Sequence, residues 1–412
     1  MFLEIPKDPD WHRLSGKHGQ RRIKRPYSVA PGRVERISPE EQPFHELPQA
    51  MIEYLLSESS TLSSGVHSSF TTLLRKKKDI REEIQSAIGI RNDRDLPISD
   101  IPTICGVDGS YLVERLLAID FTAWAAIIVE GLTPPSEKRY WPEPRFVTRV
   151  RTSSHYEETQ MVVRATMISA ENQLAVQAPH DIVLLDGSIT TPTIYLNQGL
   201  AKLKNLDTNV LATDLIEQSK IGILAYRDIL QSERTDKIFA YIPKYSTRRE
   251  IGQQLSSTQD YDDRALLSMI LNAGEFIGPV SLRTEQEWHI GISSHPQSSE
   301  ISTAAKEITE GLNSAVVFYY KPSRWSPALR IETNRKSSRN ESSIASLLKG
   351  IEYQMKTPAI LEPYPLYLAD RMVHHLSAAI PAVRRAATQE TAIKCETNMN
   401  ELFISMNAYR TE

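Results

Sequence analysis

The 412-residue sequence carries 48 Lys and Arg against 51 Asp and Glu, a formal net charge of −3, with 40% hydrophobic and 24% charged residues. These ordinary globular values exclude disordered and fibrous proteins, and the length predicts two or three domains or one large elaborated domain. Two cysteines exclude a disulfide framework and a four-cysteine zinc site. With no apolar run long enough to span a membrane and no apolar leader, we expect a cytoplasmic protein without membrane contact.

The N-terminal part of the chain divides into two predicted regions. Residues 1–37 form a basic extended arm, because residues 1–36 hold nine Lys and Arg against four Asp and Glu without periodicity. The arm is either a solvated tail or a contact for nucleic-acid phosphates. Residues 38–95 form a helical region, since Ser38-Pro39-Glu40-Glu41 is a helix start signal and apolar residues then recur at helical spacing.

The middle of the chain contains short apolar runs separated by one stretch of helical periodicity. We predict strands at 101–107, 116–132 and 145–150, a helix at 156–177 and a strand at 181–185. The later elements are predicted as a helix at 211–231, a strand at 238–245, a helix at 263–272, strands at 288–293, 315–320 and 327–333, and helices at 342–355 and 366–387.

Two of the predicted strands end in the same tripeptide, Asp108-Gly109-Ser110 and Asp186-Gly187-Ser188. Each glycine would let the chain turn sharply, and parallel neighbouring strands would bring both aspartates into one crevice at the edge of a sheet. Two close carboxylates repel each other unless a cation lies between them, and Mg²⁺ and Mn²⁺ prefer carboxylate oxygens. The alternative is that Asp-Gly is only a turn dipeptide.

A third acid, Glu171, lies near the end of the predicted helix 156–177 among apolar neighbours. It belongs either to the boundary of the core or to the crevice with the aspartates. Three strands, a helix and a fourth strand, with acids on the first and fourth strands and on the helix, are the plan of ribonuclease-H-like nucleases. We therefore predict an α/β fold with a ribonuclease-H-like mixed sheet, flanking helices, a helical N-terminal extension and two bound metal ions.

Five segments of the chain, in this order, resemble the NurA nuclease family. They are residues 106–110, 184–188, 263–267 with Gly274-Glu275, 329–332 and 363–370. The resemblance spans residues 100–390 and predicts a nuclease domain at 96–390, followed by a C-terminal tail at 391–412.

The resemblance implies a DNA nuclease that depends on Mn²⁺ or Mg²⁺ and has 5′–3′ exonuclease and endonuclease activity. It also implies a homodimer docked on a HerA-type ring ATPase, with a role in DNA end processing and double-strand break repair or in anti-phage defence. Asp108, Glu171 and Asp186 carry over as metal ligands. The last motif departs from the family pattern, because Glu362 stands at a Tyr position and Asp370 at a His position. Asp370 is predicted to be a fourth ligand; the alternative is that residues 363–370 only begin a helix and leave Asp370 solvated.

Basic side chains are concentrated in residues 321–339, which hold six Lys and Arg and one acid. With the aromatic side chains among them, they either follow a DNA strand or form a strand and a solvated loop. The residues predicted to contact DNA are Arg264, Arg330, Arg335 and Lys336.

Two alternatives to a nuclease stay open at this point. One is a catalytically silent DNA-binding adaptor of a ring ATPase, which would bind DNA without metal-dependent hydrolysis. The other is an actin-like ATPase, in which Asp-Gly turns hold nucleotide phosphates. The low glycine content, 17 residues, and the lack of a GxxxxGK[ST] loop argue against ATP hydrolysis by this chain.

Overall fold

The computed structural model describes residues 47–205, 209–255, 261–282, 288–394 and 399–406. The predicted basic arm at 1–37 lies outside the described residues, as does the helix start signal at 38–41. The chain divides into two compact units, residues 1–71 and residues 72–412. In the described part of the first unit, α1 (Gln49–Ser57) is followed by the beginning of α2 (Ser59–Ala87), which continues into the second unit.

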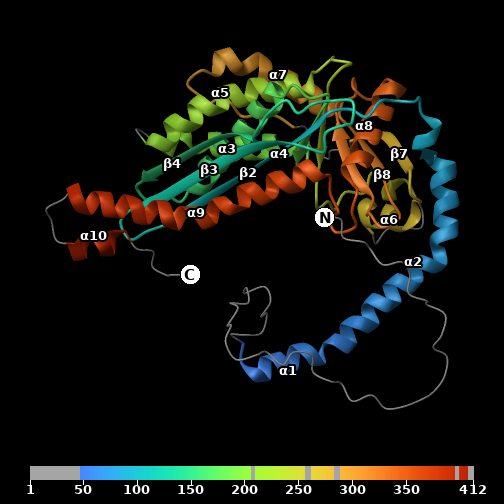
Figure 1. Cartoon of the computed structure of the whole chain (residues 1–412), viewed down its shortest axis with the longest axis horizontal. Coiled ribbons are helices and arrows are strands. Elements are labelled where there is room, and N and C mark those ends of the chain that lie inside the picture. Colours follow the sequence, from blue (N-terminus) through green and yellow to red (C-terminus); the bar gives the residue numbers. More distant parts are fainter. Residues whose placement is uncertain (1–46, 206–208, 256–260, 283–287, 395–398, 407–412) are drawn as a thin grey trace, which may run out of the picture. The chain divides into compact units, whose positions relative to one another are not determined.

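The second unit is built on a nine-stranded sheet with the order β1-β7-β8-β9-β6-β5-β2-β3-β4 (Figure 1). The three neighbours β6, β5 and β2 are parallel, and all other pairs are antiparallel. The strands are β1 (Arg91–Asn92), β2 (Ile104–Arg115), β3 (Asp120–Glu130), β4 (Arg145–Ser153), β5 (Ile182–Asp186), β6 (Ile238–Ile242), β7 (Glu275–Ser281), β8 (Val316–Lys321) and β9 (Leu329–Thr333).

Helices cover both faces of this sheet, so the central strands are buried on both sides and read as continuous apolar runs. Along β5, Val183 and Leu185 point into one core and Ile182 and Leu184 into the other. The helices of the second unit, apart from α2, are α3 (Thr159–Gln177), α4 (Thr191–Leu200), α5 (Val210–Leu230), α6 (Asp263–Ile270), α7 (Ser298–Asn313), α8 (Glu341–Gln354), α9 (Tyr364–Lys394) and α10 (Met399–Ser405).

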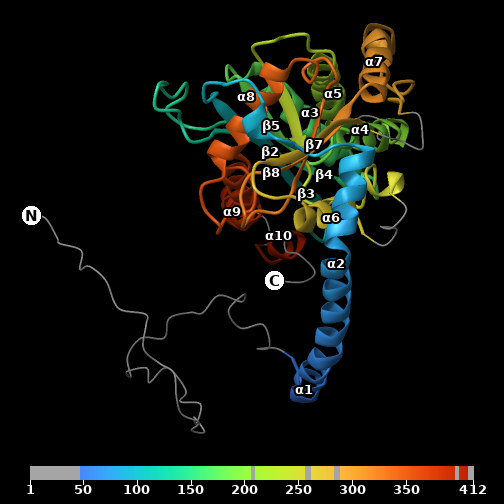
Figure 2. The ribbon, with the colours of Figure 1, turned by 90° about the vertical axis from the view of Figure 1, so that its right-hand side faces the viewer.

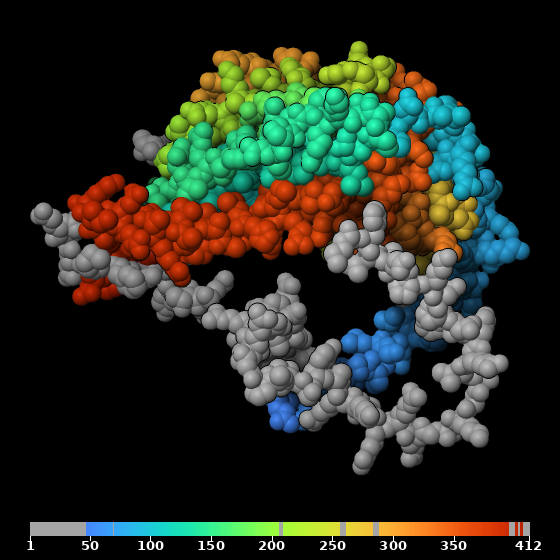
Figure 3. All heavy atoms as spheres, in the orientation of Figure 1, coloured from blue at the N-terminus to red at the C-terminus, as the bar shows by residue number. Residues whose placement is uncertain are grey.

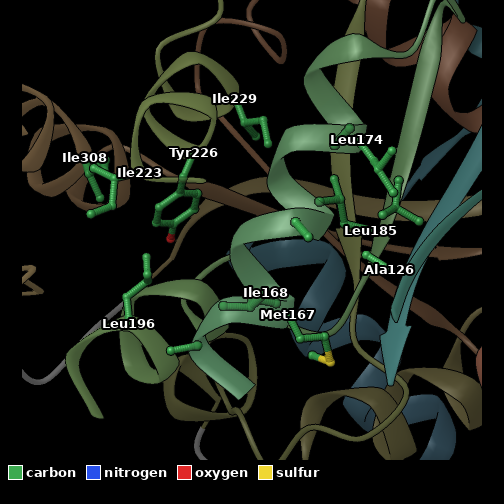
Figure 4. Packing of buried hydrophobic residues seen from close by; sticks show 14 of the residues in the cluster. Ala126, Met167, Ile168, Leu174, Leu185, Leu196, Ile223, Tyr226, Ile229 and Ile308 are labelled. Carbon is green, nitrogen blue, oxygen red and sulfur yellow. The ribbon is translucent and has the colours of Figure 1, made fainter. Parts of the chain in front are cut away.

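The first core lies between the sheet and the helices α3, α4, α5 and α7, which Figure 2 shows on one side of the strands. Helix α3 is buried around most of its circumference, and its residues Met167, Ile168 and Leu174 pack among side chains such as Leu196 and Tyr226 (Figure 4). Helix α8 covers the opposite face of the sheet. Helix α9 runs along β2 and β3 on that side, as a continuous red band in Figure 3.

The predicted mixed α/β sheet with flanking helices is confirmed, although some elements differ. The predicted turn at Asp108-Gly109-Ser110 is wrong, because β2 continues through these residues to Arg115. The predicted strand at 288–293 is also wrong, and the segment has no regular structure. Strand β7 and helices α4 and α7 were not predicted, and in β7 a Gly-Pro pair interrupts the apolar residues.

Among the helices of the described residues, none combines the length and the apolar character that crossing a bilayer requires.

Candidate metal centre

Two aspartates lie side by side where the parallel pairing of β2 and β5 ends. The paired register runs from Ile104 opposite Ile182 to Val107 opposite Leu185, so Asp108 and Asp186 are the next residues on the two strands. The Oδ1 atom of each aspartate accepts a 2.8 Å hydrogen bond from the backbone N–H of the following glycine. Only the second glycine makes a turn, because Gly187 has φ +84° whereas Gly109 continues the strand.

Asp370 reaches the two aspartates from α9. The start of this helix lies directly against β2, since a Cβ atom at Gly106 would be only 2.6–2.8 Å from the backbone of Pro365 and Leu366. This close approach places one carboxylate oxygen from each of Asp108, Asp186 and Asp370 within 4.8 Å of one another. The structure thus brings together three of the four acids that were predicted as metal ligands.

Glu171, the fourth predicted ligand, lies beside this group and not within it. It is 4% exposed on α3, and a Cβ atom at Gly109 would overlap its Oε1 atom. Gly109 is therefore required for the approach of Glu171 and not for a turn. Burial and the carboxylates of Asp108 and Asp186 raise the pKa of Glu171 well above its usual value.

A lysine that sequence reasoning missed lies among these acids. Lys244 follows the end of β6 by two residues, and its Nζ atom is 3.1 Å from Asp186, 2.8 Å from Asp370 and 3.5 Å from Glu362. Burial opposes its charge, but these carboxylates outweigh that effect and raise the pKa of Lys244. The only available signal was its place after the third parallel strand, at the same sheet edge as Asp186.

The electrostatics of this group fit a bound divalent cation. Burial and the neighbouring Asp186 raise the pKa of Asp108 to about 7, although Lys244 and a backbone N–H act in the opposite direction. Burial also raises the pKa of Glu362. One ammonium therefore faces several carboxylates held close together in a half-buried site. Hard cations such as Mg²⁺ and Mn²⁺ bind carboxylate oxygens and remove such repulsion. The adjoining cleft has a volume of about 280 Å³ and is lined in part by Asp108, Glu171 and Asp186.

A buried carboxylate holds the turn that follows Asp186. The Oε2 atom of Glu332 on β9 accepts hydrogen bonds from the Ser188 hydroxyl at 2.7 Å and from the Ile189 backbone N–H at 2.8 Å. Its other oxygen accepts from Arg330, which also donates to Glu250 at 2.6 and 2.8 Å. The prediction that Arg330 contacts DNA is wrong, because its side chain is 0% exposed and serves this network.

The other predicted DNA contacts lie in two places. Arg264 is half-buried and donates to the carbonyl of Ala328. Arg335 and Lys336 follow the end of β9, and Lys336 forms an ion pair with Glu233 at 2.6 Å. Because β9 is antiparallel to β6, these two residues lie at the edge of the sheet opposite to Asp186.

The comparisons with known proteins agree with this architecture. The NurA domain family matches residues 102–374, more than half of the chain. The NurA nuclease from Sulfolobus solfataricus has a similar fold with a TM-score of 0.55 and 13% identity, covering 85% of this chain and 99% of that one. A NurA structure bound to dAMP and manganese gives a TM-score of 0.45 at 16% identity and covers 83% of this chain and 99% of that one. None of the curated proteins matches the sequence.

The likeness to the Sulfolobus solfataricus structure, at 13% identity, shows the fold alone. The family match adds more, because it spans the parallel strands, α3 and the start of α9, and includes all four acids predicted as ligands. By this match, the chain belongs to the NurA family of nucleases.

Proposed function

We propose that this protein is a divalent-metal-dependent DNA nuclease whose metal site is formed by Asp108, Asp186 and Asp370, with Glu171 beside them. The observation that carries the proposal is the convergence of three carboxylate oxygens within 4.8 Å at the edge of the parallel strands. Buried carboxylates with raised pKa values in a cleft are typical of functional sites.

Each side chain has a defined part in this proposal. The three aspartates would hold Mn²⁺ or Mg²⁺, and Glu171 would complete a site for a second ion on the α3 side. Such ions, when bound, activate water and neutralise the charge that develops on a scissile phosphate. Gly109 keeps space for the Glu171 carboxylate, and Glu332 fixes the turn that carries Asp186. Lys244 balances the carboxylates that face it.

The test is cleavage of end-labelled duplex DNA with Mn²⁺. We expect the wild-type protein to cleave and Asp108→Asn to lose at least a hundredfold in rate, as removal of a metal ligand removes the site. The matched control is Asp236→Asn, which changes an exposed aspartate that pairs with a surface arginine, Arg234. Equal cleavage by wild type and Asp108→Asn would refute the metal site. DNA binding without any cleavage by the wild type would instead support a silent adaptor.

The finer parts of the proposal concern the reaction and its setting. We propose 5′–3′ exonuclease activity with endonuclease activity, exerted by a cytoplasmic homodimer that works with a HerA-type ring ATPase in DNA end processing, either in double-strand break repair or in anti-phage defence. The sequence has no GxxxxGK[ST] loop, so translocation energy would come from a partner. Exposed Leu62, Val66 and Phe70, which recur every four residues on α2, support a protein contact.

Copurification tests this partnership. The tagged full-length chain is coexpressed with the HerA-type ATPase of the same genome, and size-exclusion chromatography with light scattering gives the mass of the complex. We expect a complex containing two copies of this chain. Separate elution of the two proteins in the presence of ATP and DNA would contradict the partnership. The proposal of a metal site would not be affected by that result.

A further inference from the structure

An arginine lines the same cleft as the acids and is held rigidly by an aromatic ring. The Arg164 guanidinium on α3 lies over the ring of Tyr195 on α4, 4.0 Å from its centroid. Both side chains line the 280 Å³ cleft together with Asp108, Glu171 and Asp186. Stacking on a ring fixes the plane of a guanidinium and leaves its N–H groups directed outward.

The positive charge of Arg164 has no acidic counterpart. Its Nη2 atom donates to the amide oxygen of Gln198, and within the described part of the chain no carboxylate lies at ion-pair distance from it. Its Nε atom is buried without a hydrogen-bond partner. By contrast, Arg149 and Arg151 on β4 both pair with Asp214. The Nη1 atom of Arg164 makes no hydrogen bond among the described residues, so a fixed guanidinium lining the cleft keeps donors for the forked geometry of a phosphate group.

The spacing of residues on α3 separates Arg164 from the metal ligands. Arg164 and Glu171 are seven residues apart, so they lie on the same face of the helix with about 10.5 Å of helix rise between them. The guanidinium is therefore placed along the cleft from the aspartates and not over them. A DNA strand with its scissile phosphate at the aspartates would bring another of its phosphates toward Arg164.

We propose that Arg164, stacked on Tyr195, binds a phosphate of the DNA strand adjacent to the scissile one. The inference rests on the proposed nuclease function and adds a substrate subsite to it. Arg164 acts by positioning the strand, while the aspartates remain the sites of metal binding. The residue is thus expected to affect DNA affinity more than metal affinity.

The experiment measures binding of a fluorescent single-stranded oligonucleotide by anisotropy, in the Asp108→Asn background so that no cleavage occurs. We expect Arg164→Gln to raise Kd about tenfold, since it removes one charged contact. The slope of log Kd against log salt should fall by about 0.7, the value for one phosphate contact on a single strand. Arg164→Lys keeps the charge but loses the forked pair of N–H donors, so its Kd should lie between that of the Asp108→Asn background and that of Arg164→Gln.

The matched control is Arg145→Gln, because Arg145 also stacks on an aromatic ring, Trp141 at 4.9 Å, but lies on β4 and does not line the cleft. Its Kd and salt slope should equal those of the background. With Asp108 intact, Arg164→Gln should bind Mn²⁺ with wild-type affinity in calorimetry. Normal Mn²⁺ binding would also show that the variant is folded. Equal DNA affinity of Arg164→Gln and Arg145→Gln would overturn the subsite. Failure of the wild type to cleave DNA, with Arg164-dependent binding retained, would refute the nuclease proposal instead.

Discussion

At the scale of single residues, Lys244 determines the charge of the metal centre. Its ammonium contacts Asp186 and Asp370 where a cation would compete for the same oxygens. At about 4 Å and an effective dielectric constant near 20, one such interaction amounts to about 4 kcal/mol before solvent screening. The lysine therefore stabilises the metal-free site and opposes metal binding.

The substitution Lys244→Met should accordingly have two opposite effects. We expect the metal-free protein to melt at a lower temperature, because the carboxylates lose their counter-charge, and Mn²⁺ to bind on the order of tenfold more tightly. Isothermal titration calorimetry and thermal melts with and without Mn²⁺ measure both. Lys349→Met, which removes a surface pair with Glu352, serves as the control. Weaker Mn²⁺ binding by Lys244→Met would show that the lysine holds the carboxylates in place for the metal.

Gly109 is a second residue whose role depends on close approach. A Cβ atom there would overlap Glu171 Oε1 and lie 2.9 Å from Cγ of Met167. We expect Gly109→Ala to displace the Glu171 carboxylate and lower the cleavage rate by at least tenfold, while the strand persists because alanine fits its backbone. Single-turnover cleavage with Mn²⁺ measures the effect. Gly65→Ala on α2 meets no atom within 4 Å and should leave the rate unchanged. An unchanged cleavage rate in Gly109→Ala would show that the position of the Glu171 carboxylate does not matter for the reaction.

At the scale of elements, β9 controls the metal centre through β5. Glu332 accepts hydrogen bonds from Ser188 and Ile189, directly after the ligand Asp186, and is itself held by Arg330. Glu332 is buried, so no bulk water can take its place as the acceptor for these donors. The turn after β5 thus depends on a strand that lies two places away in the sheet.

The substitution Glu332→Gln tests this link. We expect about 1–3 kcal/mol of lost stability, because the amide group brings N–H donors to a buried site where every neighbour donates, while Arg330 keeps its ion pair with Glu250. Mn²⁺ affinity should fall as well, since the turn carrying Asp186 loosens. Chemical denaturation and calorimetry measure the two effects. Glu341→Gln, in an exposed pair with Arg91, should change stability by less than about 1 kcal/mol. Normal Mn²⁺ affinity in Glu332→Gln would show that the hydrogen bonds of Glu332 do not influence metal binding.

How far the sequence predicts this centre depends on the range of the interactions. Asp108 and Asp186 were readable because each directly follows an apolar run that forms a buried parallel strand. The approach of Asp370 depends on contact between Gly106 and the start of α9, more than 250 residues later, which no local pattern reveals. The roles of Lys244 and Arg330 could not be predicted from the sequence for a related reason. A single lysine after a strand carries no signal, and Glu250, which binds the Arg330 guanidinium through both carboxylate oxygens, comes from a distant segment.

At the scale of the whole molecule, the boundary between the two units lies inside α2. The sequence pattern places the end of the N-terminal helical region at residue 95, whereas the units meet at residues 71 and 72. The later part of α2 belongs to the second unit. There Leu73, Ile80 and Ile84 are buried in a core with α6 and β8. Arg81 donates to both carboxylate oxygens of Glu275 on β7, at 2.6 and 2.8 Å.

Two truncations distinguish these boundaries. Deletion of residues 1–71 removes none of these contacts, so we expect a folded protein with Mn²⁺-dependent cleavage and a Tm within a few degrees of the full chain. Deletion of residues 1–95 removes three buried aliphatic side chains, the Arg81 pair and the strand β1. At about 2–5 kcal/mol for each aliphatic side chain, the loss is comparable to the whole stability of a typical domain, about 5–15 kcal/mol. Thermal melts and cleavage assays of both proteins provide the comparison. If both truncated proteins melted like the full chain, the later part of α2 would be dispensable for the fold, and the boundary at residue 95 would be correct.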